Sequence, residues 1–249
     1  MNWRDLVLVA VSFVAGAQNA LAGGGSFLTF PALLLAGLDP RAANITSTIA
    51  LFPGQVTTGI AGRNLVTGAA GLGFATLFGI SLIGGALGAV LLLTTPAGVF
   101  AHMVPFLVLF ATSVFAWGSF GRRPDTAMAA RLGVRGAAAA QFLISIYGGY
   151  FGGGIGILML AALTATGVAV RQAGATKNVL AGVMNAAAVV VFLARAHIAW
   201  GLVLYVAIAA VLGGQAGVFL LRRINERILR AGVVLVGLGL TIGLFIDMR

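Results

Sequence analysis

The feature that most constrains this chain is a series of long apolar segments that follow one another from end to end. Of the 249 residues, 60% are hydrophobic and only 8% are charged, which is too few polar residues to cover a water-exposed domain. A helix crosses the hydrocarbon core of a bilayer with about 20 apolar residues. The sequence therefore predicts an all-α polytopic membrane protein, with apolar segments at 6–22, 26–38, 43–62, 69–93, 98–120, 132–150, 155–170, 175–194, 199–221 and 229–247.

The formal charge of +10 comes from basic residues scattered over the short loops between these segments. Such loops favour the cytoplasmic face of a membrane, so we expect the lipid bilayer as a partner and no nucleic acid. The chain has no cysteine, which excludes disulfides, thiol catalysis and thiolate metal sites. No cofactor or metal is expected. Oligomeric state is left open, with a homodimer as one alternative.

The chain repeats itself at a distance of 130 residues. Residues 23–46, placed over residues 153–176, match at nine of 24 positions without a gap, and the matches include paired glycines, an arginine and a threonine. Internal repeats of this kind are typical of secondary transporters. We expect two homologous transmembrane repeats, 1–121 and 131–249, joined by a cytoplasmic linker at 122–130.

The first apolar segment ends in Ala20-Leu21-Ala22, which imitates a signal-peptide cleavage site. Residues 136–151 occupy the equivalent place in the second half, where no signal peptide can lie. We therefore expect the first segment to be structural.

Two of the apolar segments, 26–38 and 155–170, are too short to cross a bilayer as ordinary helices. Each follows a glycine cluster, so we interpret them as re-entrant segments or broken helices that return the chain to the side from which it came. The basic loops around 122–135 and 222–230 then share the cytoplasmic face. The repeats become inverted relative to each other, and both termini lie outside. A count of eight ordinary helices would instead place one basic loop outside.

The glycine clusters predict a binding site for an anion. Backbone freed by glycine within a membrane is tolerated only where it is buried in protein or lines a cavity. A helix that begins there adds free N–H groups and the positive end of its dipole. Close helix packing is the alternative, and we prefer it for Gly84, Gly85, Gly88, Gly213 and Gly217. We assign the anion site to the triplets that precede the short segments: Gly23, Gly24 and Gly25, followed by Ser26, and Gly152, Gly153 and Gly154.

The helix after each short segment adds a stripe of polar residues. Thr48 and Gln55 are seven residues, or about two helical turns, apart, and Asn178 and Asn185 repeat that spacing. Interhelical hydrogen bonding and substrate contact both stay open as explanations. Lys177, the only lysine, would attract an anion unless it extends to the membrane interface. The candidate substrate-binding residues of these helices are Thr46, Ser47, Thr48, Gln55, Thr176, Lys177, Asn178 and Asn185.

The remaining titratable residues offer no catalytic centre. All five acidic residues lie in loops or at span ends, and His102 and His197 lie near span ends without metal-ligand spacing. No catalytic triad, carboxylate pair or phosphate-binding loop is present, so we expect no enzyme. The lack of an intramembrane carboxylate favours transport driven by the membrane potential. Proton coupling through Lys177 or a histidine is the alternative.

The stretch GGGSFLTFPALLLAGLDPRAANITST and its counterpart YGGYFGGGIGILMLAALTATGVAVRQAGATKN resemble the TauE/SafE family of membrane proteins. In that family a glycine-rich motif, an apolar helix, a short loop and a Thr/Ser-bearing helix occur in both halves. The resemblance covers essentially the whole chain. It implies motif positions at Gly23 to Ser26, Thr46 to Thr48, Gly152 to Gly154 and Thr176 to Asn178. Lys177 and Asn178, where a Thr-Ser pair is frequent, and Ile155 depart from the pattern and leave the substrate open.

The resemblance further implies a transporter of the bacterial inner membrane that exports sulfite or organosulfonates such as sulfoacetate. We therefore expect an exporter of a small sulfur oxyanion, bound between the two repeats at the N-termini of half-helices. An uptake permease for a related anion is one alternative. A channel-like pore or a non-transporting membrane scaffold, whose glycines serve only packing, is the other.

Overall fold

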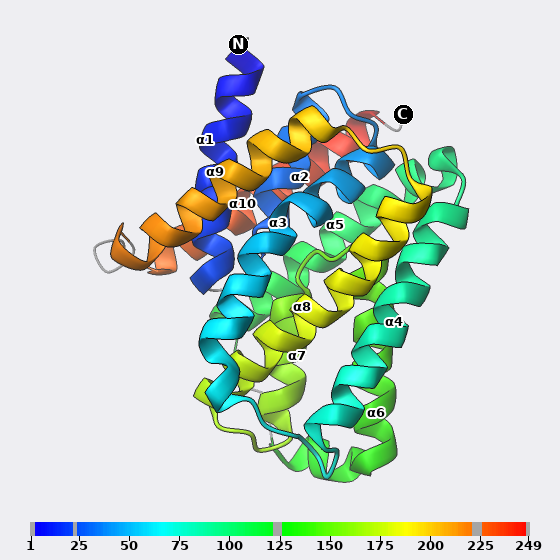
Figure 1. Cartoon of the computed structure of the whole chain (residues 1–249), viewed down its shortest axis with the longest axis vertical. Coiled ribbons are helices and arrows are strands. Elements are labelled where there is room, and N and C mark those ends of the chain that lie inside the picture. Colours follow the sequence, from blue (N-terminus) through cyan, green and yellow to red (C-terminus); the bar gives the residue numbers. More distant parts are fainter. Residues whose placement is uncertain (1–2, 22–23, 122–125, 221–225, 248–249) are drawn as a thin grey trace.

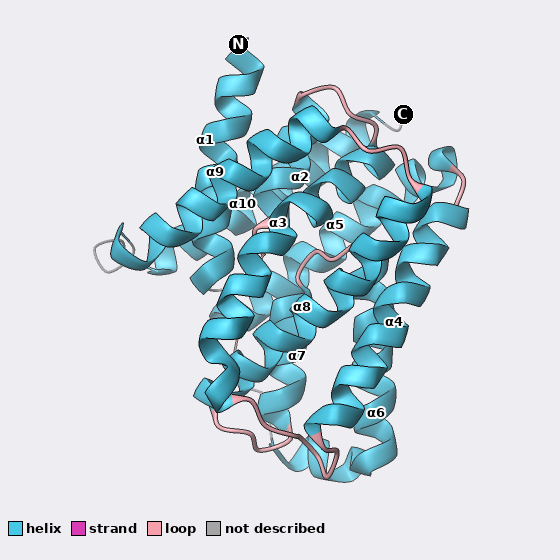
Figure 2. Cartoon of the chain, in the orientation of Figure 1, coloured by secondary structure: helices cyan, strands magenta, loops and turns pink. Residues whose placement is uncertain are grey.

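A computed structural model describes the chain except for residues 1–2, 22–23, 122–125, 221–225 and 248–249. The described residues form a bundle of helices with short connections (Figures 1 and 2). The helices are α1 (Trp3–Leu21), α2 (Ser26–Leu35), α3 (Pro40–Gly62), α4 (Phe74–Thr94), α5 (Ala97–Phe120), α6 (Thr126–Tyr150), α7 (Ile155–Ala165), α8 (Val170–Arg195), α9 (Trp200–Leu220) and α10 (Glu226–Asp247), with a 3-10 turn at Arg63–Leu65.

The apolar segments expected from the sequence are confirmed as helices, and their ends differ by a few residues for local reasons. Helix α3 begins at Pro40, three residues earlier than expected, because the Asp39 carboxylate accepts hydrogen bonds from the N–H groups of Arg41 and Ala42 at 3.0 and 3.1 Å. Helix α4 begins five residues late because residues 69–72 form a tight turn, closed by two backbone hydrogen bonds between Ala69 and Leu72.

Three helices, α4, α5 and α8, are long and apolar enough to cross a membrane. Shorter apolar stretches lie in α1, α2, α7, α9 and α10. Large hydrophobic side chains such as Leu143, Val190 and Ile242 are at least 60% exposed, which suits a surface that faces lipid. Helices α2 and α7 hold only 10 and 11 residues, a length of about 15 Å.

The two short helices start near the middle of the molecule and run to opposite ends. In Figure 1 the connection from α2 to α3 lies at the upper end and the connection from α7 to α8 at the lower end. Each short helix packs against the helix before it and the helix after it. Helix α3 packs against α8 across the centre, so the beginnings of α2 and α7 are brought to the same interior region.

The contacts between helices 3–120 and helices 126–247 come in matching pairs. Helix α1 packs on α9 as α6 packs on α4, and α3 packs on α9 as α8 packs on α4. Helix α10 contacts α2 as α5 contacts α7. Positive φ angles also recur 130 residues apart, at Gly24 and Gly154 (85° and 75°) and at Gly37 and Gly167 (97° and 86°).

Four glycines of α4 and α9, namely Gly84, Gly85, Gly88 and Gly213, lie at close helix contacts, which agrees with the packing role expected from the sequence. A Cβ atom at Gly84 would lie 2.6 Å from Cβ of Ser145 in α6, and one at Gly88 would collide with the Ile146 carbonyl oxygen. Gly85 and Gly213 are equally crowded by backbone atoms of α8 and α1. The surroundings of Gly217 are not among those that the structure describes.

The expected linker at 122–130 is only partly covered. Residues 122–125 lie outside the described residues, and 126–130 form the beginning of α6. Gly133, with φ 59°, separates that beginning from the rest of the helix. Arg122, Arg123, Arg222 and Arg223, on which the prediction of a shared cytoplasmic face depends, also lie outside the described residues, so that topology stays a prediction.

We expect Gly88→Ala to destabilise the protein, because the added methyl group meets α6 backbone that cannot move aside. Overpacking of this kind costs about 1–3 kcal/mol. Gly79→Ala in the same helix is the matched control, since a Cβ at Gly79 meets nothing within 4 Å. Thermal unfolding in detergent should show a lower midpoint for Gly88→Ala only. Equal midpoints for the two variants would contradict the packing role.

Candidate anion-binding site

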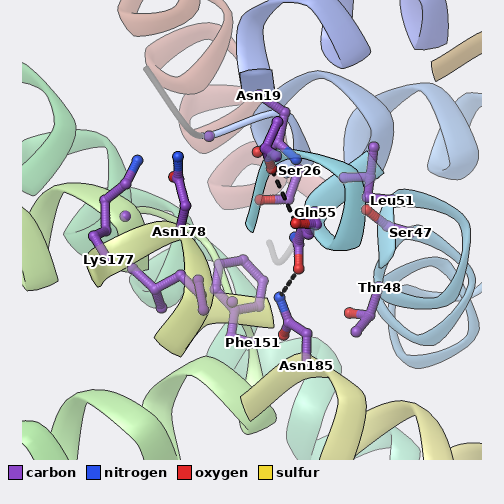
Figure 3. A pocket seen from close by; sticks show the side chains of 16 residues that line it. Asn19, Ser26, Ser47, Thr48, Leu51, Gln55, Phe151, Lys177, Asn178 and Asn185 are labelled. Atoms are coloured by element: carbon purple, nitrogen blue, oxygen red, sulfur yellow. Dashed lines mark hydrogen bonds between the residues drawn. The ribbon is translucent and has the colours of Figure 1, made fainter. Parts of the chain in front are cut away.

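A cavity of about 50 Å³ lies where the starts of α2 and α7 meet the crossing of α3 and α8 (Figure 3). Its wall combines one glycine of each triplet, Gly24 and Gly152, with polar residues of α3 and α8. The lining residues are Asn19, Gly24, Ser26, Ser47, Thr48, Leu51, Gln55, Thr58, Phe151, Gly152, Ile155, Gly156, Lys177, Asn178, Ala181 and Asn185.

The first turns of α2 and α7 border this cavity through Ser26, Ile155 and Gly156. The N-caps, Gly25 and Gly154, have no side chain and give no capping hydrogen bond. The first N–H groups of a helix have no partner within the helix. Because residues of both first turns line this cavity, the positive ends of two helix dipoles lie beside the same space, which favours an anion.

Glycine is needed at the cavity edge because of backbone geometry. Gly24 and Gly152 have φ angles of 85° and 79°, which residues with a Cβ rarely adopt. At Gly24 a Cβ atom would also approach the ring of Phe115 to 3.0 Å.

The amides of Gln55 and Asn185 join α3 to α8 across the cavity. Asn185 Nδ2 donates a hydrogen bond to Gln55 Oε1 at 2.6 Å. The two residues are 130 positions apart, so each occupies the place of the other in its own half. The pair therefore forms an interhelical hydrogen bond that holds α3 and α8 together. It also lines the cavity, where the Nε2 group of Gln55 stays available as a donor.

Lys177 is the one cationic residue in the described cavity wall. It is only 7% exposed, which excludes the alternative that its side chain extends to the membrane interface. It makes no hydrogen bond or ion pair to any described residue, and no carboxylate lines the cavity. Figure 3 shows Lys177 and Asn178 side by side, across the Gln55–Asn185 pair from Ser47 and Thr48.

Nine of the residues proposed from the sequence line this cavity: Gly24, Ser26, Ser47, Thr48, Gln55, Gly152, Lys177, Asn178 and Asn185. Five others do not: Gly25, Thr46, Gly153, Gly154 and Thr176. Gly23 lies outside the described residues.

The residues that miss the cavity have other partners. The Thr176 hydroxyl accepts a hydrogen bond from Thr67 N–H at 3.0 Å and contacts Thr67 O at 3.4 Å, so it anchors the connection between α3 and α4. Thr46 is 1% exposed. Gly153 faces Phe151 and Ala111, so the glycine of the second triplet that borders the cavity is Gly152. A Cβ atom at Gly154 would lie 3.2 Å from the Ala111 carbonyl oxygen.

Gly25 is buried at the N-cap of α2, where its N–H donates to Asn19 Oδ1 at 3.4 Å. Its place at the helix start is as expected, but it does not border the cavity.

The sequence analysis missed several lining residues. Thr58 could have been found, because it lies three residues after Gln55 and is therefore its neighbour on the helix surface. Asn19 could not be found by comparing the halves, since its counterpart is Gly149. Phe151 carries no polar signal.

Among the described residues, no group of three or more His, Asp and Glu side chains could hold a metal ion. His102 and His197 are exposed and lie outside the cavity wall. The Nδ1 atom of His102 is 2.7 Å from the Gly98 carbonyl oxygen of its own helix.

Residues 8–244 match the model of the sulfite exporter TauE/SafE family. The chain belongs to this family. It is therefore an integral membrane protein of a transporter family and not an enzyme.

Curated relatives extend over nearly the full chain. A "probable membrane transporter protein" of Haemophilus influenzae is 27% identical over 243 residues, 97% of this chain and 94% of that protein. One from Sinorhizobium is 31% identical over 247 residues, 96% and 92% of the two chains. A third, from Escherichia coli, is 26% identical over 245 residues, 97% and 89% of the two chains. No solved structure is significantly similar to the chain.

We expect Thr176→Val to lower the free energy of unfolding by about 1 kcal/mol, because it leaves the Thr67 backbone groups without a partner. Thr48→Val is the matched control, since the Thr48 hydroxyl bonds only to the Asn44 carbonyl of its own helix. Unfolding and anion binding should be measured for both. Thr176→Val should affect stability and Thr48→Val should affect binding. A Thr176 variant that folds normally but loses binding would return Thr176 to the site.

Proposed function

We propose that this protein exports a small sulfur oxyanion, sulfite or a small organosulfonate, and binds it in the cavity between α2, α3, α7 and α8. The observation that carries the proposal is Lys177, a buried cation without a described partner, in a cavity that no described carboxylate lines.

A buried charge is costly unless an opposite charge compensates it. In this cavity the chain offers only further positive ends, those of α2 and α7, and uncharged polar groups. A ligand with negative charge would supply the missing compensation. Ionised sulfur oxyanions accept hydrogen bonds, which suits a wall of ammonium, backbone N–H, amide and hydroxyl donors.

The size of the cavity favours a compact ligand. A cavity needs roughly 10–15 Å³ to hold one water, so about 50 Å³ gives room for roughly four atoms of that size. Sulfite has four heavy atoms. A longer organosulfonate would have to extend its tail beyond this cavity.

We also infer that the two halves are inverted repeats, with the anion bound between them. The 130-residue register, the recurring positive φ angles and the recurring helix contacts support this inference. So do the opposite directions of α2 and α7 in Figure 1. In transporters built this way, half-helix N-termini near the bilayer midplane hold anionic groups, and the repeats rock about the site.

Export of an anion needs no coupled ion. A negative charge that leaves a cell with a negative interior gains about 2.3 kcal/mol per 100 mV, which supports a roughly 50-fold gradient of a monoanion. No described acidic residue lies in the cavity to relay a proton. Lys177 would then attract the anion and reduce its desolvation cost.

We expect Lys177→Met to reduce sulfite flux into or out of liposomes at least about tenfold, because a desolvated charge pair is worth 1.4 kcal/mol or more. Arg171→Met is the matched control, since Arg171 lies exposed in the first turn of the same helix. Its flux should stay close to that of the unaltered protein. Unchanged flux in Lys177→Met would remove Lys177 from the site, and no flux from the unaltered protein with any sulfur oxyanion would favour the scaffold alternative.

We expect electrogenic transport, with a rate that follows the membrane potential. Flux in liposomes at clamped potential, with and without a pH gradient, tests this. Accumulation driven by a pH gradient at zero potential, beyond what protonation of the free anion explains, would instead indicate proton coupling.

A further inference from the structure

A second cavity, of about 190 Å³, lies between α1, α3 and α9 and borders the anion site. The two cavities share Asn19, Leu51 and Thr58 in their walls. These three residues therefore form a wall that the two cavities have in common.

The second cavity reaches the surface and suits a hydrated anion. Thr57, Ala61 and Gln215 in its wall are exposed. None of its described lining residues is charged, and several carry hydroxyl or amide groups. Helices α3 and α9 pack on each other but leave room beside two glycines. A Cβ atom at Gly54 would meet nothing within 4 Å, and one at Gly214 would come no closer than 3.6 Å to its neighbours.

The equivalent place in the other half, between α4, α6 and α8, is filled. The residue 130 positions after Gly54 is Met184, which is fully buried. Cβ atoms at Gly85 and Gly148 would collide with it. Ala188, the counterpart of Thr58, is also fully buried. Of these two equivalent regions, one is open and the other is closed.

We propose that the second cavity is the passage through which the anion reaches its site from the cytoplasm, and that Met184 closes the route on the opposite side. The passage is lined by the second halves of α3 and α9, and the sequence after α9 carries Arg222 and Arg223. Clustered positive charge marks a cytoplasmic segment and raises the local concentration of anions. This inference rests on the proposed function and topology, since it names the route to that site.

Release on the other side requires the closed region to open. Methionine is unbranched and flexible, so Met184 can change rotamer more readily than a β-branched residue could. Inward movement of α3 onto α9 would close the passage at the same time.

Thiol accessibility tests the passage, because the natural chain has no cysteine. Thr58→Cys and its counterpart Ala188→Cys are prepared in inside-out and right-side-out membrane vesicles and treated with iodoacetate. This reagent is small and negatively charged, and it forms a thioether that sulfite does not cleave. We expect iodoacetate applied from the cytoplasmic side to modify Thr58→Cys at least about tenfold faster than Ala188→Cys, because thiol reactivity follows exposure. Sulfite flux through the modified Thr58→Cys protein should fall.

Modification of Thr58→Cys only from the outside, or equal rates for the two variants, would overturn the proposal. Gln215→Cys, at the exposed mouth, gives the same comparison if Thr58→Cys folds poorly. Labelling needs no transport, whereas the flux of the unaltered protein tests the proposed function. If iodoacetate modifies Thr58→Cys slowly although the unaltered protein transports sulfite, the proposed passage is wrong and the proposed function is unaffected.

Discussion

The interior of this protein holds a positive charge, that of Lys177, which no described acidic side chain neutralises. The first turns of α2 and α7 add the positive ends of two helix dipoles to the same cavity. Without an anion, only water and polar side chains can offset this concentration of positive potential, at a considerable desolvation cost. An anion bound as proposed would offset this potential, and water in the cavity would do so in its absence.

Both of the proposed repeats contribute helices to this cavity, but they contribute different chemical groups. The second half supplies the charge through Lys177, where the first half has Ser47. The Ser47 hydroxyl lies 2.7 Å from that of Thr29, so the first half offers a neutral, hydrogen-bonded wall. The packing also differs between the two equivalent regions. Gly54 leaves space beside α3, whereas Met184, 130 positions later, fills the corresponding space beside α8. An asymmetric site can thus arise from a repeated framework by a few substitutions.

Hydropathy and glycine were sufficient to predict the helices and the two short segments. Both signals act locally, since lipid selects apolar length and a triplet of glycines interrupts a helix. The side of the backbone that faces the cavity was harder to predict. Gly152 and Gly154 have positive φ angles and Gly153 does not, so neighbouring glycines of this turn present different sides of the backbone. Gly152 therefore borders the cavity and Gly153 does not. The surroundings of Thr176 were hard to predict for a similar reason, because its hydroxyl bonds to Thr67, which is 109 residues away in the sequence.

Contacts between distant segments explain what the sequence could not predict at all. The cavity between α1, α3 and α9 depends on how far two helices stand apart, and neither helix alone encodes that distance. The repeat offered an indirect signal, since unequal side chains at equivalent positions, such as Gly54 and Met184, indicate unequal packing. Comparison of the halves position by position was more informative here than the motif itself.

The donor set of the cavity suits passage better than retention. A site that conducts an ion must bind it strongly enough to admit it and weakly enough to release it. An arginine would hold a sulfur oxyanion through two fixed, parallel hydrogen bonds, whereas lysine presents a compact charge on a flexible stem. The amides, hydroxyls and helix N-termini add further donors without a second full charge. In the proposed export, movement of the wall shared with the neighbouring cavity would let water replace these contacts one at a time. The anion would then leave without breaking a rigid ion pair.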